Sequence, residues 1–514
     1  MNDSKNLLTD FDLCLAISQK AINSQMAYAW KAWKRRKQFS DTLDIYPKKN
    51  DGTPSRFGLT AEIAPLEVSL NVEDGKLGQV KVTLTLKSGN VHYYDEDEEQ
   101  AADQAISNWS LSFITDLDKK PVDLETIASI DPAAYETVQK TIDASGLPDD
   151  VFSIEYLFMK LTEVDLLLSD NKNVSIPAAV SQYARTRTLS CLNNLLQGEM
   201  GEFMLGTVVR RNTKHQTPTF AMTDFVFDVH ANWKAADAAA LSYLGMFSGR
   251  NLPDDRNAAR IKLSDDWINP AMIDGTQGLV SGIMAIRKEV LLDNYLMPQF
   301  MKELGASPVV DGLKRRFVFQ DSSSHTSRDL VDRKVEQSRS YWLEIAIAPG
   351  TNRLDISGSI EGSFSYTEHT LGPLGTETAR LEAAGNQPVS GSVTLTTPGG
   401  TSDFSVNSQL NYSIGDFKQT KDDASGFGVV ENGVSWIPKL LGISKGTMLE
   451  MLGGIVADKV SVLHTALQNA LGHVEVDMSQ SHFIPPGGGV FAFQNLRFSS
   501  QTGDLLLDVI YKAP

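Results

Sequence analysis

Histidines are the first residues to consider for metal or acid–base chemistry. The chain has eight, at positions 92, 215, 230, 325, 369, 464, 473 and 482, and none has a second histidine within a few residues. A zinc protease would need the His-Glu-x-x-His spacing, which is absent. His230, at the end of a predicted strand, could be a ligand, but an isolated histidine is more often structural. The sequence therefore predicts no metal site.

A glycine run near the C-terminus raises the question of phosphate binding. The segment Phe483 to Phe498 reads FIPPGGGVFAFQNLRF. A phosphate-binding loop places its glycines before a helix, whose free N–H groups bind the anion, and the nucleotide-binding form ends in Lys-Ser or Lys-Thr. Here the aromatic residues alternate after the glycines, which predicts a strand. We interpret the prolines and glycines as a turn into that strand.

Hydroxyl side chains cluster beside a histidine in SSSHTS, residues Ser322 to Ser327. Nucleophilic catalysis needs a base that faces the nucleophile and a third group that orients the base, and sequence neighbours do not supply this geometry. The Gly-x-Ser-x-Gly elbow is also absent. The many carboxylates cannot be paired across space from sequence alone. We expect no catalytic residues and no cofactor, and predict that the protein is not an enzyme.

Composition limits the class of protein further. The chain has 514 residues and a formal net charge of −17, which disfavours broad nucleic-acid binding because that requires a basic surface. Its two cysteines, Cys14 and Cys191, exclude a disulfide scaffold and a thiolate zinc site. No classical signal peptide and no stretch of about 20 apolar residues is present. We expect a soluble protein made in the cytoplasm, with release by another route left open.

The elements that must position any site include three predicted long helices. Apolar residues at three- and four-residue steps predict the first over about 8–37, with Asp10 as N-cap and a basic end at Lys34 to Lys37. The second is predicted over Pro270 to Leu304. The third covers roughly 446–475, directly before the closing strands. Pro121 is expected in the first turn of a shorter helix.

Strands make up most of the remaining pattern. Period-2 alternation predicts a hairpin over residues 65–87, a bulged strand at 220–230, and long one-sided strands at 354–366 and 404–414. Residues 151–168 mix the two periods, and we interpret them as a strand. Residues 320–334 are predicted to be a linker or exposed loop. Because strands are grouped and do not alternate with helices, the fold class is α+β. The predicted domains are 1–330, with insertions, and 331–514.

Long helices laid on one-sided strands can enclose an elongated apolar groove. Gly358 and Gly362 fall on the apolar face of their strand, where they would let the sheet curl or a second molecule approach closely. Periodicity does not tell whether side chains or a lipid tail fill such a groove.

The C-terminal segment resembles the closing signature of the OrfX-type proteins and their companion non-toxic proteins of clostridial neurotoxin and insecticidal toxin gene clusters. The resemblance rests on Phe483, Pro486-Gly487-Gly488, the Phe491-x-Phe493 strand, Phe498, and the final Asp504-Leu505 strand with Tyr511. Pro485 and Gly489 are additional to that pattern. The specific motif covers only the last thirty or so residues.

The family is similar to the tubular lipid-binding (TULIP) superfamily, in which a strongly curved antiparallel sheet wraps a long helix, often in two lobes. The resemblance implies binding of a lipid or phosphoinositide and assistance to a bacterial toxin. The leading hypothesis is therefore a non-enzymatic, TULIP-like protein that binds an apolar ligand along the helix–sheet seam. The alternative is a structural or interaction protein with filled lobes that docks a toxin or another partner chain.

Under the leading hypothesis, the ligand lies against apolar residues of the first helix, the long strand and the last helix. The candidate lining residues are Leu15, Ile22, Met26, Trp30, Ile356, Ile360, Phe364, Val456, Val460 and Leu463. Burial of a lipid tail contributes about 0.8 kcal/mol per CH₂ group, so such a site needs no charged residue. Lys34, Arg35 and Arg36 are the candidates for contact with an anionic headgroup or a membrane surface. They also suit a helix C-terminus, whose dipole favours cations.

Overall fold

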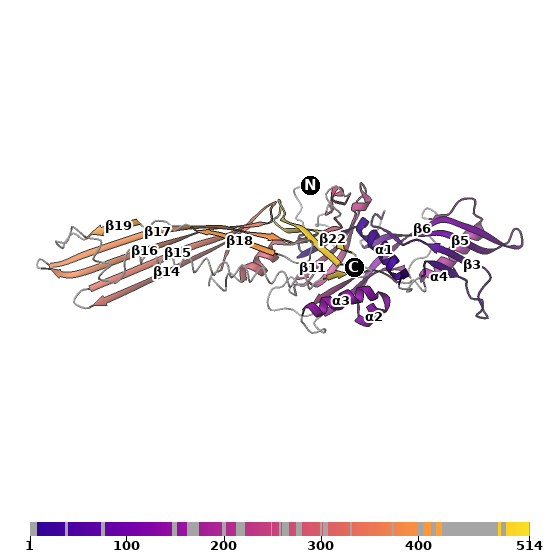
Figure 1. Ribbon diagram of the computed structural model, residues 1–514, viewed down its shortest axis with the longest axis horizontal. Helices are drawn as coiled ribbons and strands as arrows, with labels where there is room; N and C mark the ends of the chain where they lie inside the picture. Colours follow the sequence, from indigo (N-terminus) through magenta and orange to yellow (C-terminus); the bar gives the residue numbers. More distant parts are fainter. Residues whose placement is uncertain are drawn as a thin grey trace.

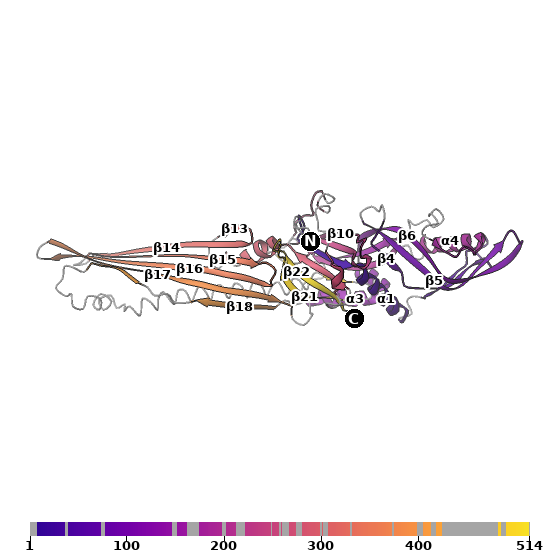
Figure 2. The same cartoon turned by 90° about the horizontal axis from the view of Figure 1, so that it is seen from above.

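The computed structural model is an elongated molecule built from three antiparallel sheets that follow one another along its long axis (Figure 1). The first and last strands of the chain lie near the middle of the molecule, and long strands extend to both of its ends (Figure 2). The structure describes residues 8–35, 40–72, 78–145, 152–161, 174–197, 202–211, 222–247, 249–255, 259, 267–273, 280–298, 301, 307–328, 332–372, 375–397, 405–412, 418–423, 482–484 and 490–512.

A nine-stranded sheet forms one end of the molecule. Its main order is β2-β3-β5-β6-β7-β9-β20, with β4 beside β5 and β8 beside β6. The strands are β2 (Thr42–Ile45), β3 (Gly58–Ile63), β4 (Glu67–Ser69), β5 (Gln79–Asp95), β6 (Gln100–Val122), β7 (Phe152–Lys160), β8 (Val174–Ser175), β9 (Glu202–Arg211) and β20 (His482–Ile484). The predicted hairpin is confirmed, because β4 pairs with β5. The strand predicted over residues 151–168 is confirmed over Phe152–Lys160 as β7, and its residues 162–168 lie outside the described residues.

Alternation decides which face of this sheet is covered. Along β5, Val80, Val82, Leu84 and Leu86 are buried, and the residues between them are half-buried. Helix α4 (Gln182–Gln197) packs against β3 and β5 and contributes Cys191 and Leu192 to the main hydrophobic core. The period-2 pattern of the sequence therefore corresponds to a sheet with one covered face.

A six-stranded sheet occupies the middle of the molecule, in the order β10-β11-β1-β12-β22-β21. Its strands are β1 (Leu13–Ser18), β10 (Met222–His230), β11 (Ala240–Phe247), β12 (Gly282–Ile286), β21 (Val490–Phe498) and β22 (Leu505–Lys512). The bulge predicted in the strand at 220–230 is confirmed as a register shift between Met222 and Asp224. A strand, and not a helix, follows the glycine run, as predicted.

The prediction of the first long helix is wrong in its N-terminal part. Residues 13–18 form β1, which lies between β11 and β12, and helix α1 covers only Gln19–Arg35. Every residue of β1 is buried, with odd-numbered side chains in the main core and Cys14 and Ala16 in a second core on the other face. A short apolar run with both faces buried has no alternation, so spacing alone does not separate strand from helix. The N-cap is Ser18, not Asp10, since the Ser18 Oγ accepts a hydrogen bond from the Ala21 N–H at 3.1 Å.

The second long helix is also corrected. Its described residues divide into the short helix α6 (Pro270–Ile273), strand β12 and the π-helix η5 (Val290–Leu296). All five residues of β12 are buried, and a Cβ added at Gly282 would lie 2.1 Å from the Ala16 carbonyl oxygen. The glycine therefore permits close approach of β12 to β1, and tertiary packing outweighs helical spacing. The third predicted helix, about 446–475, lies outside the described residues.

A seven-stranded sheet of long strands forms the other end of the molecule. Its order is β13-β14-β15-β16-β17-β18, with β19 beside β17. The strands are β13 (Val309–Asp311), β14 (Lys314–Arg328), β15 (Asp332–Ala348), β16 (Arg353–Gly372), β17 (Gly375–Thr396), β18 (Ser405–Tyr412) and β19 (Lys418–Asp423). The strands predicted at 354–366 and 404–414 are confirmed as β16 and β18.

The predicted linker at 320–334 was wrong. Residues Gln320 to Arg328 continue β14, and Asp332 to Lys334 begin β15, with continuous pairing from Lys314↔Ala346 to Arg328↔Asp332. The polar, serine-rich composition suggested a loop. Backbone pairing with β15 instead extends the strand, because an antiparallel ladder needs no apolar side chains to satisfy its N–H and C=O groups.

Two further helices cover one side of the β7–β9–β20 region. Helices α2 (Leu124–Ile130) and α3 (Pro132–Ser145) bury Ile127, Val138 and Ile142 against Ile154 and Ile484. The expected place of Pro121 was wrong: it belongs to the end of β6, and the α2 N-cap is Asp123, whose side chain accepts from the Thr126 N–H. A short 3-10 helix, η4 (Ala236–Ala238), directly precedes β11.

The turn between β21 and β22 holds a buried carboxylate with a predictable pH effect. Burial raises the pKa of the Asp504 carboxyl, against the opposing effect of the hydrogen bonds donated by the Lys288 N–H and the Thr502 hydroxyl. The folded state therefore holds this proton more tightly than the unfolded state does. The contribution of Asp504 to the free energy of unfolding is largest below the unfolded pKa of about 3.9 and falls as pH rises through the folded pKa.

Asp504→Asn removes this titration while keeping an acceptor oxygen for Lys288. We expect the free energy of unfolding of the variant, relative to the wild type, to rise between about pH 4 and about pH 7. Urea denaturation at both pH values measures the difference. A difference that stays constant, or that falls, would contradict the assigned direction.

Candidate functional site

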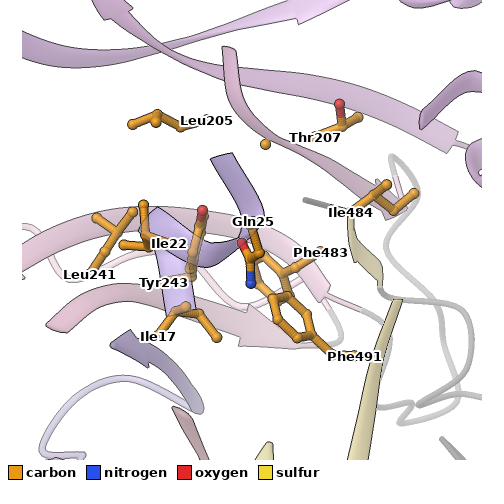
Figure 3. A pocket seen from close by; sticks show the side chains of 11 residues that line it. Ile17, Ile22, Gln25, Leu205, Thr207, Leu241, Tyr243, Phe483, Ile484 and Phe491 are labelled. Atoms are coloured by element: carbon orange, nitrogen blue, oxygen red, sulfur yellow. The ribbon is translucent and has the colours of Figure 1, made fainter. Parts of the chain in front are cut away.

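A pocket lies under helix α1, where the middle sheet meets the nine-stranded sheet (Figure 3). The space that a water-sized group can occupy is about 20 Å³. All the empty space of the pocket, including its opening to solvent, is about 350 Å³. The first volume is enough for about one water-sized group. The pocket is lined by Ile17, Ile22, Gln25, Leu205, Gly206, Thr207, Leu241, Tyr243, Phe483, Ile484 and Phe491.

Helix α1 is held over the pocket by side-chain amides that bond to a neighbouring strand. The Asn23 amide accepts from the Val68 N–H at 2.8 Å and donates to the Val68 carbonyl at 3.0 Å. Gln19 Oε1 accepts from the Leu70 N–H at 2.7 Å. Ile22, Met26 and Trp30, at three- and four-residue steps from Gln19 and Asn23, lie on the same buried side of the helix and belong to the main core. The fixed position of α1 determines which of its side chains reach the pocket.

The segment from Phe483 to Phe498 joins the two sheets. Its β20 part pairs with β9 in the nine-stranded sheet, and its β21 part pairs with β22 in the middle sheet. Phe483 and Phe491, on either side of the Pro-Gly run, both line the pocket. Phe483 packs against Tyr243 with ring centroids 4.6 Å apart, and Phe491 meets Tyr511 edge-on at 6.3 Å. The motif therefore supplies two aromatic walls to one pocket.

One polar side chain on α1 enters this apolar surrounding. Gln25 is 4% exposed, and its Nε2 has no hydrogen-bond partner among the residues that the structure describes. Figure 3 shows its amide among Ile22, Phe483 and Phe491. A buried donor without a partner costs about 1–3 kcal/mol, so the position of this amide needs a physical explanation.

The lining of the pocket is mostly apolar. Among the lining residues, none is a histidine, cysteine, lysine, arginine or carboxylate. Burial raises the pKa of the Tyr243 hydroxyl, which keeps it neutral. In the described part of the chain, no group of three or more His, Cys, Asp or Glu side chains is placed to hold a metal ion.

Comparisons with known proteins give distant structural likenesses. No family model matches the chain, and no curated protein matches it. Among solved structures, P47 from Clostridium botulinum A2 is similar with a TM-score of 0.46 and 10% identity over 98% of each chain. A lipopolysaccharide binding protein is similar with a TM-score of 0.28 and 12% identity over 98% of this chain and 99% of its own. Scores and identities this low do not identify the function of this chain.

The structure places the predicted lining residues at different distances from the pocket. Ile22 lines it directly. Leu15, which belongs to β1 and not to the first helix, and Met26 and Trp30 on α1 are buried in the surrounding core. Ile356 is buried in the same core but belongs to β16 of the seven-stranded sheet.

Other predicted lining residues receive no test from the structure. Ile360 and Phe364 lie on β16, but their side chains are not described. Val456, Val460 and Leu463 lie outside the described residues. Their role as ligand contacts stays a prediction.

Lys34, the first of the three basic residues predicted to contact a headgroup or membrane, is already paired with a carboxylate. Lys34 forms an ion pair with Asp41, and its hydrogen bond to that carboxylate raises the pKa of the lysine and lowers that of Asp41. The side chain of Arg35 and the whole of Arg36 are not described. Contact of Lys34 with a headgroup would require it to exchange one carboxylate for another anion.

Sequence reasoning missed most of the pocket. Gln25 could have been found, because it is a polar residue on the apolar face marked by Ile22, Met26 and Ala29. Phe483 and Phe491 were noted as parts of a turn and strand, not as walls of a site. No feature of the sequence distinguishes the other lining residues from ordinary core residues, because each lies on a strand with the same apolar pattern. These residues are Leu205, Leu241 and Tyr243.

In the described part of the chain, no helix has both the length and the apolar character needed to cross a membrane.

Proposed function

We propose that this protein is a non-enzymatic binder of an apolar or amphipathic ligand, such as a lipid, which it holds at the seam between α1 and the two sheets. The observation that carries the proposal is the pocket under α1, where aliphatic and aromatic walls surround a single unpartnered amide. Pockets for small molecules are commonly apolar, with a few polar groups that orient the ligand.

The small volume of the pocket means that a ligand can enter only if protein groups move. A space of about 20 Å³ takes only the end of a ligand, so a longer chain must displace side chains or lift α1 from the sheets. The hydrogen bonds that Asn23 accepts from Val68 on β4, and Gln19 from Leu70 just after β4, hold one side of α1 in place. We infer that opening occurs on the other side of the helix, where Phe491 stands.

The resemblance of the C-terminal segment to toxin-cluster proteins supports a finer proposal, a TULIP-like protein that assists a bacterial toxin. A phosphoinositide would fit this role if Lys34 and its neighbours contact the headgroup. No described residue bears directly on a toxin partner, so the proposal rests on the sequence motif.

The test uses the neutral apolar dye 1-N-phenylnaphthylamine, whose fluorescence rises on burial, together with native mass spectrometry of the purified protein. We expect saturable dye binding by the wild type. Ile22→Trp fills the pocket from α1 and should weaken dye binding by at least about tenfold, the equivalent of about 1.4 kcal/mol. Ile114→Trp, at an exposed position of β6, is the matched control and should bind as the wild type does.

A second, smaller substitution tests the pocket in case Ile22→Trp does not fold. A Cβ at Gly206 would meet the Ile484 carbonyl oxygen at 3.4 Å and the Tyr243 hydroxyl oxygen at 3.6 Å, which are ordinary contact distances. Gly206→Ala should therefore fold normally and weaken dye binding. Wild-type protein that binds no dye and carries no lipid would overturn the proposal.

A second candidate function is a structural or interaction protein with filled lobes. The small pocket favours it, as do three exposed apolar side chains near one sheet edge, Val309 and Val310 on β13 and Val318 on β14. Exposed apolar groups at a sheet edge are typical of surfaces that contact another chain. Failure of all apolar ligands to bind, with the fold intact, would favour this candidate.

A further inference from the structure

The buried amide of Gln25 carries information about which ligand the pocket takes. Its Nε2 lies in the pocket with no partner among the described residues. Apolar side chains form most of the surrounding wall, and the side chains of Thr207 and Tyr243 are the other polar ones in the lining. An amide N–H is satisfied only by an acceptor atom. The missing partner is therefore an oxygen or another acceptor, carried by the ligand into an apolar surrounding.

The charge of that acceptor follows from the lining. No charged side chain lines the pocket, so an ionised carboxylate or phosphate would be buried there without a counter-charge. Burial of an unpaired ion costs far more than one amide hydrogen bond returns. The amide thus favours an uncharged acceptor attached to an apolar group, and the carbonyl of an acyl ester has both features.

We propose that the pocket recognises the carbonyl oxygen of an uncharged acyl ester, with Gln25 Nε2 as hydrogen-bond donor. This inference rests on the proposed function and makes it specific: the protein selects a neutral acyl ester over the corresponding free acid. The apolar walls contribute affinity, and Gln25 contributes the choice of ligand.

A bound water is the competing account of the same geometry. The volume of about 20 Å³ admits one water, which would need two or more polar partners in the pocket. If a water satisfied Gln25 in the ligand-free protein, removal of the amide would break a hydrogen-bonded group and lower stability. If the amide is unsatisfied, its replacement by an apolar side chain of similar size relieves the cost and raises stability.

The experiment measures competition of methyl octanoate and octanoate against bound 1-N-phenylnaphthylamine at about pH 7.5, where octanoate is ionised. For the wild type we expect methyl octanoate to compete at least about tenfold more strongly. Gln25→Leu should lower the ratio of ester affinity to dye affinity by about tenfold and should raise the melting temperature of the ligand-free protein. Gln100→Leu, which alters an exposed amide at the start of β6, is the control and should change neither quantity.

The outcomes separate this inference from the function on which it rests. Equal competition by ester and acid, an unchanged ester-to-dye ratio in Gln25→Leu, or a lower melting temperature in that variant would each overturn ester recognition by Gln25. In all three cases dye binding by the wild type would still support an apolar ligand site. Absence of dye binding by the wild type would overturn both proposals together.

Discussion

Asp293→Ala is expected to lower the free energy of unfolding by about 3–5 kcal/mol, because it leaves a buried guanidinium without its counter-charge. Arg315 on β14 is 1% exposed. Its Nε and one terminal nitrogen, Nη2, donate to the two carboxylate oxygens of Asp293 at 2.5 and 2.8 Å, and Nη1 donates to the Gly312 and Lys314 carbonyls. This two-point pair joins the π-helix η5 to the first strands of the seven-stranded sheet.

The two partners of this pair should not be equivalent. Asp293 is 32% exposed, so Arg315→Met leaves a carboxylate that water can still solvate, and the methionine fills the apolar part of the site. We expect Arg315→Met to cost less than Asp293→Ala. Urea denaturation gives both values, and equal costs would contradict this account. Glu344→Ala, which breaks the neighbouring pair with the exposed Lys314, should cost less than about 1 kcal/mol.

Trp109→Ala is expected to destabilise the nine-stranded sheet by about 3–5 kcal/mol, through lost apolar burial and the cavity that remains. Trp109 on β6 is 1% exposed and lies opposite Leu86 of β5 in the register. It belongs to the main core, to which α4 adds Leu192 and Leu196. Neighbouring side chains can close only part of the space that the indole leaves.

Ile114→Ala on the same strand is the matched control. Ile114 is 44% exposed and lies five residues from Trp109, which places it on the opposite face of β6. We expect its loss to cost less than about 1 kcal/mol. Chemical denaturation followed by circular dichroism measures both variants. Similar losses at the two positions would show that the two faces of the sheet do not differ as the burial pattern indicates.

Local sequence pattern is sufficient to predict the strands that have one buried face and one exposed face. β5 and β16 were predicted because apolar residues alternate with polar ones, a pattern that only a half-covered strand produces. The spacing predicts helix over β1 and β12, and this prediction is wrong because both faces of each strand are buried, which removes the alternation. The polar composition of Gln320 to Arg328 predicts a loop, and this prediction is wrong because pairing with β15 extends β14 through these residues.

The sequence alone determined that the chain is acidic, dominated by grouped one-sided strands and without a recognisable catalytic motif, since these properties depend on composition and local spacing. It also marked Ile22 and the aromatics of FIPPGGGVFAFQNLRF as residues of interest. Only the tertiary structure decided that this motif joins two sheets and that Gln25 lies between its phenylalanines. The physical reason is that the pocket is assembled from α1, β1, β9, β11, β20 and β21, and contacts between segments so far apart in the chain leave no periodic trace in any one of them.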